Sequence, residues 1–212
     1  MRSRRTARPI PTALAAAVLL LTGCGDGGDG TGEDASSSQG AEQDHNDADV
    51  RFATQMIPHH AQALMMTDMT AGRELSKETA ALVDAIRAAQ APEIELMTDW
   101  LQEWGEPVPA TVRDHVHGGH DGGTSGGTDG MDGMDEMDGM MSEEDLAELE
   151  QARPAEFEDM WLSMMVEHHE GAVAMAEDEL ADGAYQPALD LAEEIARSQT
   201  EEIEQMEAML AD

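Results

Sequence analysis

The chain contains one uncommon motif twice, and this repetition constrains its fold more than any other feature. Residues 56–60 read MIPHH, and residues 165–169 read MVEHH. A shift of 109 residues aligns the two copies without a gap and gives 13 identities over 46 positions. In the motif region, Met56, His59, His60, Ala63 and Met66 match Met165, His168, His169, Ala172 and Met175.

The repeat continues into a second segment, and both segments have the apolar spacing of a helix. There, Leu82, Ile86, Gln90, Glu93, Ile94, Glu95, Met97 and Leu101 match Leu191, Ile195, Gln199, Glu202, Ile203, Glu204, Met206 and Leu210. Each copy is therefore a helical hairpin. A lone hairpin cannot bury its apolar stripe, whereas two packed face to face make a four-helix bundle. The sequence predicts an all-α fold made of two duplicated hairpins.

Punctuating residues set the expected boundaries of this bundle, which covers 46–212. Gly72 and Ser76 separate the two helices of the first hairpin, 46–104, which stops at Gly105. The second hairpin, 142–212, should start with a short helix from Ser142 to about 150 and break near Arg153-Pro154. A long helix over about 155–182 and a last one from near Pro187 complete the prediction.

Two segments lack helical periodicity. Residues 24–45 have almost nothing apolar to bury, which favours a disordered tether. Residues 105–141 are rich in Met, Gly and Asp and predict a long flexible loop between the hairpins.

The first 23 residues have the pattern of an export signal. Four arginines precede a short apolar run that ends in Leu21-Thr22-Gly23-Cys24. This ending looks like a bacterial lipobox, which implies cleavage before Cys24, lipid on its sulfur, and anchoring at the extracytoplasmic face of the cell membrane. An ordinary secretory signal is the alternative. Because Cys24 is the only cysteine, intrachain disulfides, iron–sulfur clusters and covalent c-type haem are excluded.

The charge of the chain restricts its ligands. Without the signal, 7 basic and 46 acidic residues remain, a formal charge of −39. Such a surface repels nucleic acid and attracts cations. We therefore expect a metal ion among its ligands, and neither nucleic acid nor a nucleotide.

The repeated polar residues lie on the helix faces that should point into the bundle. His59 and His60 fall at the edges of the inner stripe, with the small Ala63 between them, within about a third of the helix circumference. Gln90 and Glu93 share the inner stripe of the next helix, and buried polar groups need partners. One interpretation is a hydrogen-bond network that fixes helix register. The other is a metal site, in which Gln90, Glu93, Gln199 and Glu202 act as ligands or support the histidines.

Thioether and imidazole without thiolate suit Cu(I). The predicted bundle ligands are Met56, His59, His60, Met66, Met97, Met165, His168, His169, Met175 and Met206. The loop adds weaker candidates, because its backbone would have to be ordered by each ion. These are His115, His117, His120, Met131, Met134, Met137, Met140 and Met141. Pro58 and Pro92 correspond to Glu167 and Glu201 in the second copy, so we expect kinks that make the two sites differ.

The motifs MIPHHAQALMM and MMVEHHEGAVAMA, with the Q-x-x-E-I-x-x-M-x-x-W-L pattern at 90–101, resemble domain-of-unknown-function family 305 over about 46–212. The resemblance implies a ferritin-like four-helix bundle that is usually exported. It also implies copper binding outside the cytoplasm for some members. The long Met-rich insert between the hairpins is a departure from the family pattern.

The sequence favours a lipid-anchored protein that binds or buffers copper and is not an enzyme. A structural or partner-binding bundle without metal is one alternative, and a non-covalent haem bundle is another. A ferritin-like di-metal oxidase is a third, although the Glu-x-x-His pattern of that class is missing from the inner stripes. A homo-oligomer or a copper-delivery partner stays open.

Overall fold

The computed structural model describes residues 45–111 and 137–211. Within these two stretches the chain forms helices and no strands, which confirms the predicted all-α class. The expected signal peptide, Cys24, almost all of the tether and residues 112–136 of the expected loop lie outside the described residues.

The first hairpin consists of α1 (Asp47–Asp68) and α2 (Lys77–Trp104). Asn46 and Asp49 cap the start of α1 reciprocally, and the Ser76 side chain accepts a hydrogen bond from the Thr79 backbone at the start of α2. Gly105 ends α2 with φ +76, a left-handed conformation in which glycine avoids the steric cost of a Cβ. These are the boundaries that the cap residues predict.

The second half contains α4 (Glu143–Gln151), α5 (Pro154–Asp182) and α6 (Gln186–Leu210). Ser142 forms a capping box with Asp145, and α5 and α6 each carry proline in the first turn, where the missing N–H costs nothing. Each of these elements lies within a residue or two of its expected position.

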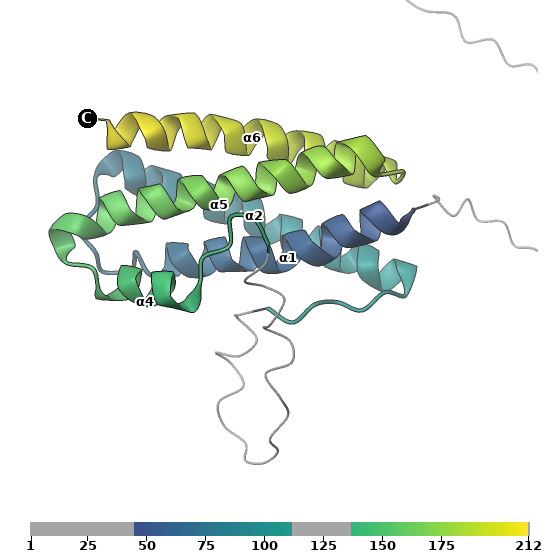
Figure 1. Ribbon diagram of the computed structural model, residues 1–212, viewed down its shortest axis with the longest axis horizontal. Helices are drawn as coiled ribbons and strands as arrows, with labels where there is room; N and C mark the ends of the chain where they lie inside the picture. The colour runs from purple at the N-terminus through teal and green to yellow at the C-terminus, as the bar shows by residue number, and fades with distance from the viewer. Residues whose placement is uncertain (1–44, 112–136, 212) are drawn as a thin grey trace, which may run out of the picture. The chain divides into compact units, whose positions relative to one another are not determined.

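The four long helices pack as a bundle, and the short α4 packs against α5 (Figure 1). α1 contacts both α2 and α5, and α5 contacts α6. Buried apolar side chains form two clusters. The first joins the beginning of α1 and the end of α5, and includes Phe52 and Ala176. The second joins the end of α1 and the beginning of α5, and includes Met66 and Trp161.

The two ends of the bundle are closed by equivalent carboxylates that lie 109 positions apart in the sequence. Asp49 on α1 accepts hydrogen bonds from the backbone N–H groups of Ala184 and Tyr185, just before α6. Glu158 on α5 accepts them from the backbone of Ser76 and the hydroxyl of Thr79, at the start of α2. Each hairpin therefore holds the turn of the other, which fixes how the two halves dock.

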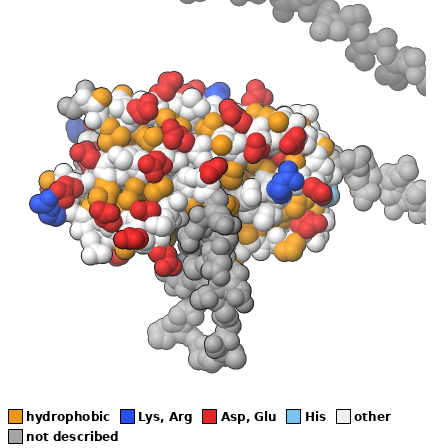
Figure 2. Space-filling model, in the orientation of Figure 1, with side chains coloured by type: hydrophobic (Ala, Val, Ile, Leu, Met, Phe, Trp, Pro, Cys, Tyr) orange, Lys and Arg blue, Asp and Glu red, His pale blue; other side chains and the backbone are white. Residues whose placement is uncertain are grey.

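Both interior prolines lie inside continuous helices: Pro58 in α1 and Pro92 in α2. No helix in the described part of the chain has the length and apolar character needed to cross a membrane. Acidic side chains are spread over the face of the bundle seen in Figure 2, with few basic ones among them, in keeping with the net charge of −35.

Candidate metal centre

The four repeated histidines lie together in the middle of the bundle, between the two apolar clusters. His59, His60, His168 and His169 are all fully buried. The rings of His59 and His168, one from each repeat, have centroids 3.8 Å apart and are tilted by 40°. The ring centroids of His168 and His169 are 6.3 Å apart. The duplicated motif therefore converges on one place.

A glutamate from the neighbouring helix orients one histidine in each repeat. The distance from His60 Nε2 to a Glu93 carboxylate oxygen is 2.7 Å, and that from His169 Nε2 to Glu202 is 2.8 Å. With Nε2–H donating to the carboxylate, Nδ1 is the ring atom left with a lone pair. Neither Nδ1 has a hydrogen-bond partner. This is the arrangement in which a carboxylate prepares a histidine to bind a metal ion.

The other two histidines have no carboxylate partner. Nδ1 and Nε2 of both His59 and His168 are buried and make no hydrogen bond of regular geometry. Burial lowers the pKa of His59 to about 3, and the nearby His60 and His169 add to this effect. Burial also lowers the pKa of His168 well below its ordinary value, with His59 contributing next. The backbone of Asp138 beside His59, and that of His59 beside His168, act on these rings in the opposite sense to burial and raise the pKa. Both rings are therefore neutral at pH 7, the form that can bind a metal ion.

The candidate methionines divide crosswise between the repeats. Met56 and Met97 are buried in the first apolar cluster, against which Met175 packs from the second repeat. Met165 and Met206 are buried in the second cluster together with Met66 from the first repeat. Each side of the histidine layer thus carries three thioethers related by the repeat.

Gln90 and Gln199 are also buried beside this region, each from the helix that carries the glutamate. Their side-chain carbonyl oxygens have no hydrogen-bond partner. A register-fixing network would satisfy such groups. The two His–Glu pairs therefore satisfy only some of the buried polar groups of the repeat, and the amide oxygens of Gln90 and Gln199 are not among them.

A short segment, residues 137–141, crosses the bundle beside His59, and we call it the strap. Gln62 on α1 donates a hydrogen bond to the carbonyl of Met141 and accepts one from its N–H, each at 2.8 Å. Gly139, at φ +80, packs against Gly171 on α5; an added Cβ on Gly171 would come within 2.0 Å of the Asp138 carbonyl oxygen. The backbone of Asp138 influences the pKa of His59, which places the strap next to the ring.

The sequence predicted that the flexible loop extends to residue 141, and this is wrong for Met141, which is buried in the bundle. Met141 is 7% exposed and belongs to the second apolar cluster, whereas the sequence predicts a flexible residue there. Met137 and Met140 are partly buried. The remaining loop candidates, His115, His117, His120, Met131 and Met134, lie outside the described residues. Sequence reasoning did not identify Gln62 and Gly171; the one available signal was a glycine inside a helix where the other repeat has glutamine.

The described residues contain no group of three His, Cys, Asp or Glu side chains that already forms a metal cage. They do contain buried imidazole nitrogens without partners and methionine sulfur on both sides of them. A metal ion held here would take thioether as well as imidazole ligands, and this mixed set suits Cu(I). The residues present therefore fit a soft metal ion better than a carboxylate-bound one.

Solved structures share this fold. A DUF305 fragment from Deinococcus radiodurans is 28% identical, with a TM-score of 0.61, over 78% of this chain and 97% of that one. CopM in its Cu(II)-bound form is 30% identical, with a TM-score of 0.59, over 77% of this chain and 95% of CopM. CopM has also been solved with Cu(I) and with silver.

A DUF305 protein from Streptomyces coelicolor, which is proposed to be secreted, is 28% identical, with a TM-score of 0.63, over 77% of this chain and 92% of that one. None of the curated proteins matches the chain. The family model described as domain of unknown function DUF305 matches residues 49–210, which include both hairpins. The chain therefore belongs to the DUF305 family.

Proposed function

We propose that this protein binds and buffers copper, chiefly as Cu(I), at the buried histidine–methionine centre. The observation that carries the proposal is the set of six ring nitrogens, on four fully buried histidines, that make no hydrogen bond of regular geometry. A buried polar group without a partner costs about 1–3 kcal/mol. A bound metal ion would compensate this cost, and the glutamates already orient two of the rings.

The structural relatives support a soft metal ion. CopM has been solved with Cu(I), Cu(II) and silver. Cu(I) and silver are both soft ions that accept thioether ligands. The methionines on either side of the histidine layer would supply such ligands to this chain.

The alternatives fit the geometry less well. A di-metal oxidase of the ferritin type needs carboxylates from several helices around the metals. Here Glu93 and Glu202 are each engaged by a histidine. A purely structural network would leave fewer of the buried ring nitrogens without partners. We therefore propose a binding protein rather than an enzyme.

We further propose that the protein works outside the cytoplasm, held by lipid on Cys24. The support is the export-signal pattern and the Leu-Thr-Gly-Cys ending, together with the proposed secretion of the Streptomyces relative. Changing Cys24 to Ala should move the protein from the membrane fraction to the soluble fraction. If the variant still sediments with membranes, lipid on Cys24 is not the anchor.

A set of three proteins tests the copper centre. Metal content is measured after purification without added metal, and Cu(I) affinity by competition with chelators of known strength. Replacing His59, His60, His168 and His169 together with alanine should abolish the tight site. Deleting residues 118–136 should lower copper capacity and leave the tight site intact, because the strap is kept.

Circular dichroism shows whether the variants stay helical. If the histidine variant stays helical and keeps the tight site, or if wild-type protein prefers Zn(II) to Cu(I) at pH 7, the proposed centre is wrong.

A further inference from the structure

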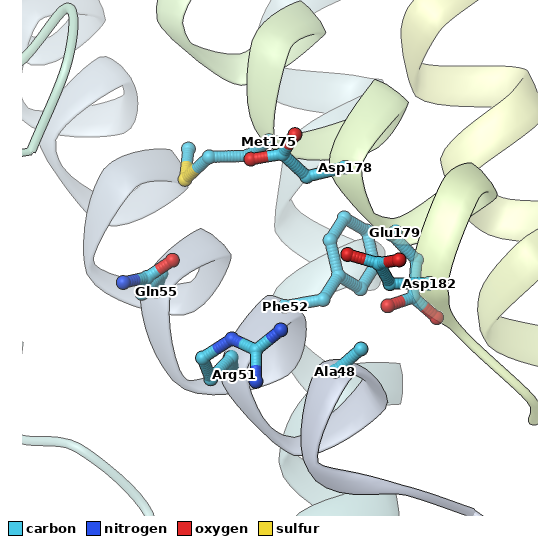
Figure 3. A pocket seen from close by; sticks show the side chains of 8 residues that line it. All are labelled: Ala48, Arg51, Phe52, Gln55, Met175, Asp178, Glu179 and Asp182. Carbon is cyan, nitrogen blue, oxygen red and sulfur yellow. The ribbon is translucent and has the colours of Figure 1, made fainter.

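A pocket opens at one end of the bundle, between the first turns of α1 and the last turns of α5 (Figure 3). Its volume is about 140 Å³, and Arg51 and Phe52 line it from α1. From α5, Asp178, Glu179 and Asp182 line it, with Met175 beside them. None of the four histidines lines this pocket, and Met175 is the one candidate ligand of the metal centre that does.

Glu179 is the unusual residue in this pocket. It is 2% exposed, and no N–H group or hydroxyl donates to either of its carboxylate oxygens. Its one hydrogen-bond partner is the Asp49 carboxylate, and that bond needs a proton on one of the two acids. Its polar neighbour is Asp49, another buried carboxylate, which already accepts the N–H groups of Ala184 and Tyr185. Two acids thus face each other. Because only Asp49 receives N–H donors from the fold, the pair needs a shared proton or a cation between its oxygens.

The other end of the bundle shows that the fold does not need this second acid. There Glu158 takes the place of Asp49, and the residue equivalent to Glu179 is Thr70. Thr70 is also buried, and its hydroxyl donates to the carbonyl of Thr67, so no second buried carboxylate faces Glu158 there. Glu179 is therefore an addition specific to one end.

The residue that packs against the Glu179 carboxylate is a glycine, which leaves space for it. A Cβ on Gly183 would lie 2.4 Å from a carboxylate oxygen of Glu179. The residue equivalent to Gly183 in the first repeat is Glu74. A buried carboxylate without donors is unfavourable unless a proton or a cation neutralises it. Burial and Asp49 raise the pKa of Glu179 to about 8, so at pH 7 a cation that binds here displaces a proton from the pair.

We propose that Asp49, Glu179 and the adjoining pocket form a second cation site, which takes a divalent cation that prefers oxygen ligands. Carboxylates supply most of its polar lining, and Asp178 and Asp182 lie exposed at the mouth, where they attract cations. Oxygen ligands of this kind favour ions of the Ca²⁺, Mg²⁺ and Mn²⁺ class over Cu(I). In the described part of the chain no three acids form a ready cage, so an ion bound here would keep several of its waters.

Arg51 opposes cation binding at this site. Its guanidinium lines the pocket and lowers the pKa of Glu179, so it competes with the ion for the carboxylate. The site is therefore weaker than a site made of acids alone. Removing the positive charge should strengthen it.

The aromatic side chains near Asp49 allow a direct assay with Tb³⁺, which binds oxygen ligands as Ca²⁺ does. The Tyr185 N–H donates to Asp49, and its ring packs edge-on against Trp100 and Trp104. Excitation of these rings should sensitise the luminescence of Tb³⁺ bound in the pocket, and Ca²⁺ should displace it. We expect Glu179→Thr, which installs the residue of the other repeat, to weaken binding by about tenfold or more.

Glu177→Thr is the matched control, because it removes the same charge from an exposed position on α5. It should bind Tb³⁺ as wild-type protein does, which separates the pocket from general attraction by an acidic surface. Arg51→Gln should bind Tb³⁺ about two- to fivefold more tightly. Circular dichroism and the copper titration confirm that the variants fold. If Glu179→Thr and Glu177→Thr bind alike, or if Arg51→Gln weakens binding, the proposed cation site is overturned.

Discussion

The two hairpins carry the same residues at the histidine layer in the centre of the bundle. They differ at the positions that contact the strap. Both carry His-His on the first helix and a glutamate on the second, at equivalent distances of 2.7 and 2.8 Å from a ring nitrogen. They differ at the position beyond the histidines, which is Gln62 in α1 and Gly171 in α5. Those two residues together hold the strap over the centre.

This comparison separates what the repeat requires from what was added to it. Features present in both copies are the histidine layer, on which the proposed metal centre rests, and the capping carboxylates Asp49 and Glu158 at the two ends. Features present once are the strap over α1 and α5, and Glu179 at one end of the bundle. We expect equivalent substitutions of the repeated residues to have equal effects in the two hairpins. Substitutions of the residues present once have no equivalent in the other hairpin.

The largest expected effect comes from single histidine changes. If His59 and His168 form one shared pair, His59→Ala and His168→Ala should each abolish the tight Cu(I) site. The loss should exceed the 10–100-fold that is typical when a supporting partner is removed. Competition titration with chelators measures it. Should either variant keep half of the copper at unchanged affinity, the protein has two independent sites.

The glutamates should have the next largest effect, equal in the two repeats. Glu93→Gln and Glu202→Gln each keep the shape and remove the charge that orients a histidine, so Cu(I) affinity should fall by about 10–100-fold. Glu95→Gln and Glu204→Gln are matched controls, since both residues are repeated and exposed. Equal losses in the controls would mean that overall charge, and not ring orientation, sets the affinity.

The parts of the structure that depend on local signals could be predicted from the sequence. Ser76, Gly105, Ser142 and Pro154 set helix ends through caps and turns, and the helices begin and end within a few residues of them. The inner stripes predicted that the glutamate of each hairpin could meet the histidines of the same hairpin, as His60–Glu93 and His169–Glu202 do. Whether the four histidines form one centre or two could not be predicted from the sequence.

The strap and the capping carboxylates could not be predicted in this way. The Gln62–Met141 pair joins residues 79 apart through backbone groups, which leave no trace in side-chain periodicity. The bonds of Asp49 and Glu158 connect opposite repeats, so they depend on how the hairpins dock. The crosswise division of the methionines has the same cause.

The strap should produce a moderate change in stability, with a diagnostic sign. Glycine to alanine inside a helix ordinarily stabilises by about 0.5–1 kcal/mol. Gly171→Ala should instead destabilise by about 1–3 kcal/mol, because the new Cβ overlaps the Asp138 carbonyl. Gln62→Ala should cost about 1–3 kcal/mol by leaving two backbone groups of Met141 unpaired. Urea unfolding measures both, and a stabilising Gly171→Ala would show that the strap does not pack there.

The smallest expected effect is a pH dependence of the free energy of unfolding. Its sign differs between Glu179 in the pocket and the buried histidines. The pKa of Glu179 is raised to about 8 from 4.5. The native state then binds the proton more tightly than the unfolded chain, so stability falls as pH rises from about 4.5 to about 8. The pKa of His59 is lowered to about 3 from 6.5, so its contribution is lost in the other direction, as pH falls from about 6.5 to about 3. Above about pH 7 His59 is mostly neutral in the folded and the unfolded state, so Glu179 supplies the larger of these two slopes up to about pH 8.

Comparison with a variant that cannot ionise isolates Glu179. In a chelating buffer, wild-type stability from urea unfolding should fall relative to Glu179→Gln between pH 7 and 8, with a difference in slope of at most about 1.4 kcal/mol per pH unit. Glu179→Gln keeps the shape, cannot ionise, and should remove this slope, whereas Asp178→Asn, at the exposed mouth, should leave it unchanged. Because the equivalent residue at the other end is Thr70, no matching slope arises there. If Glu179→Gln and wild type lose stability in parallel across this range, Glu179 does not carry a proton that the fold must release, and the two ends of the bundle are alike.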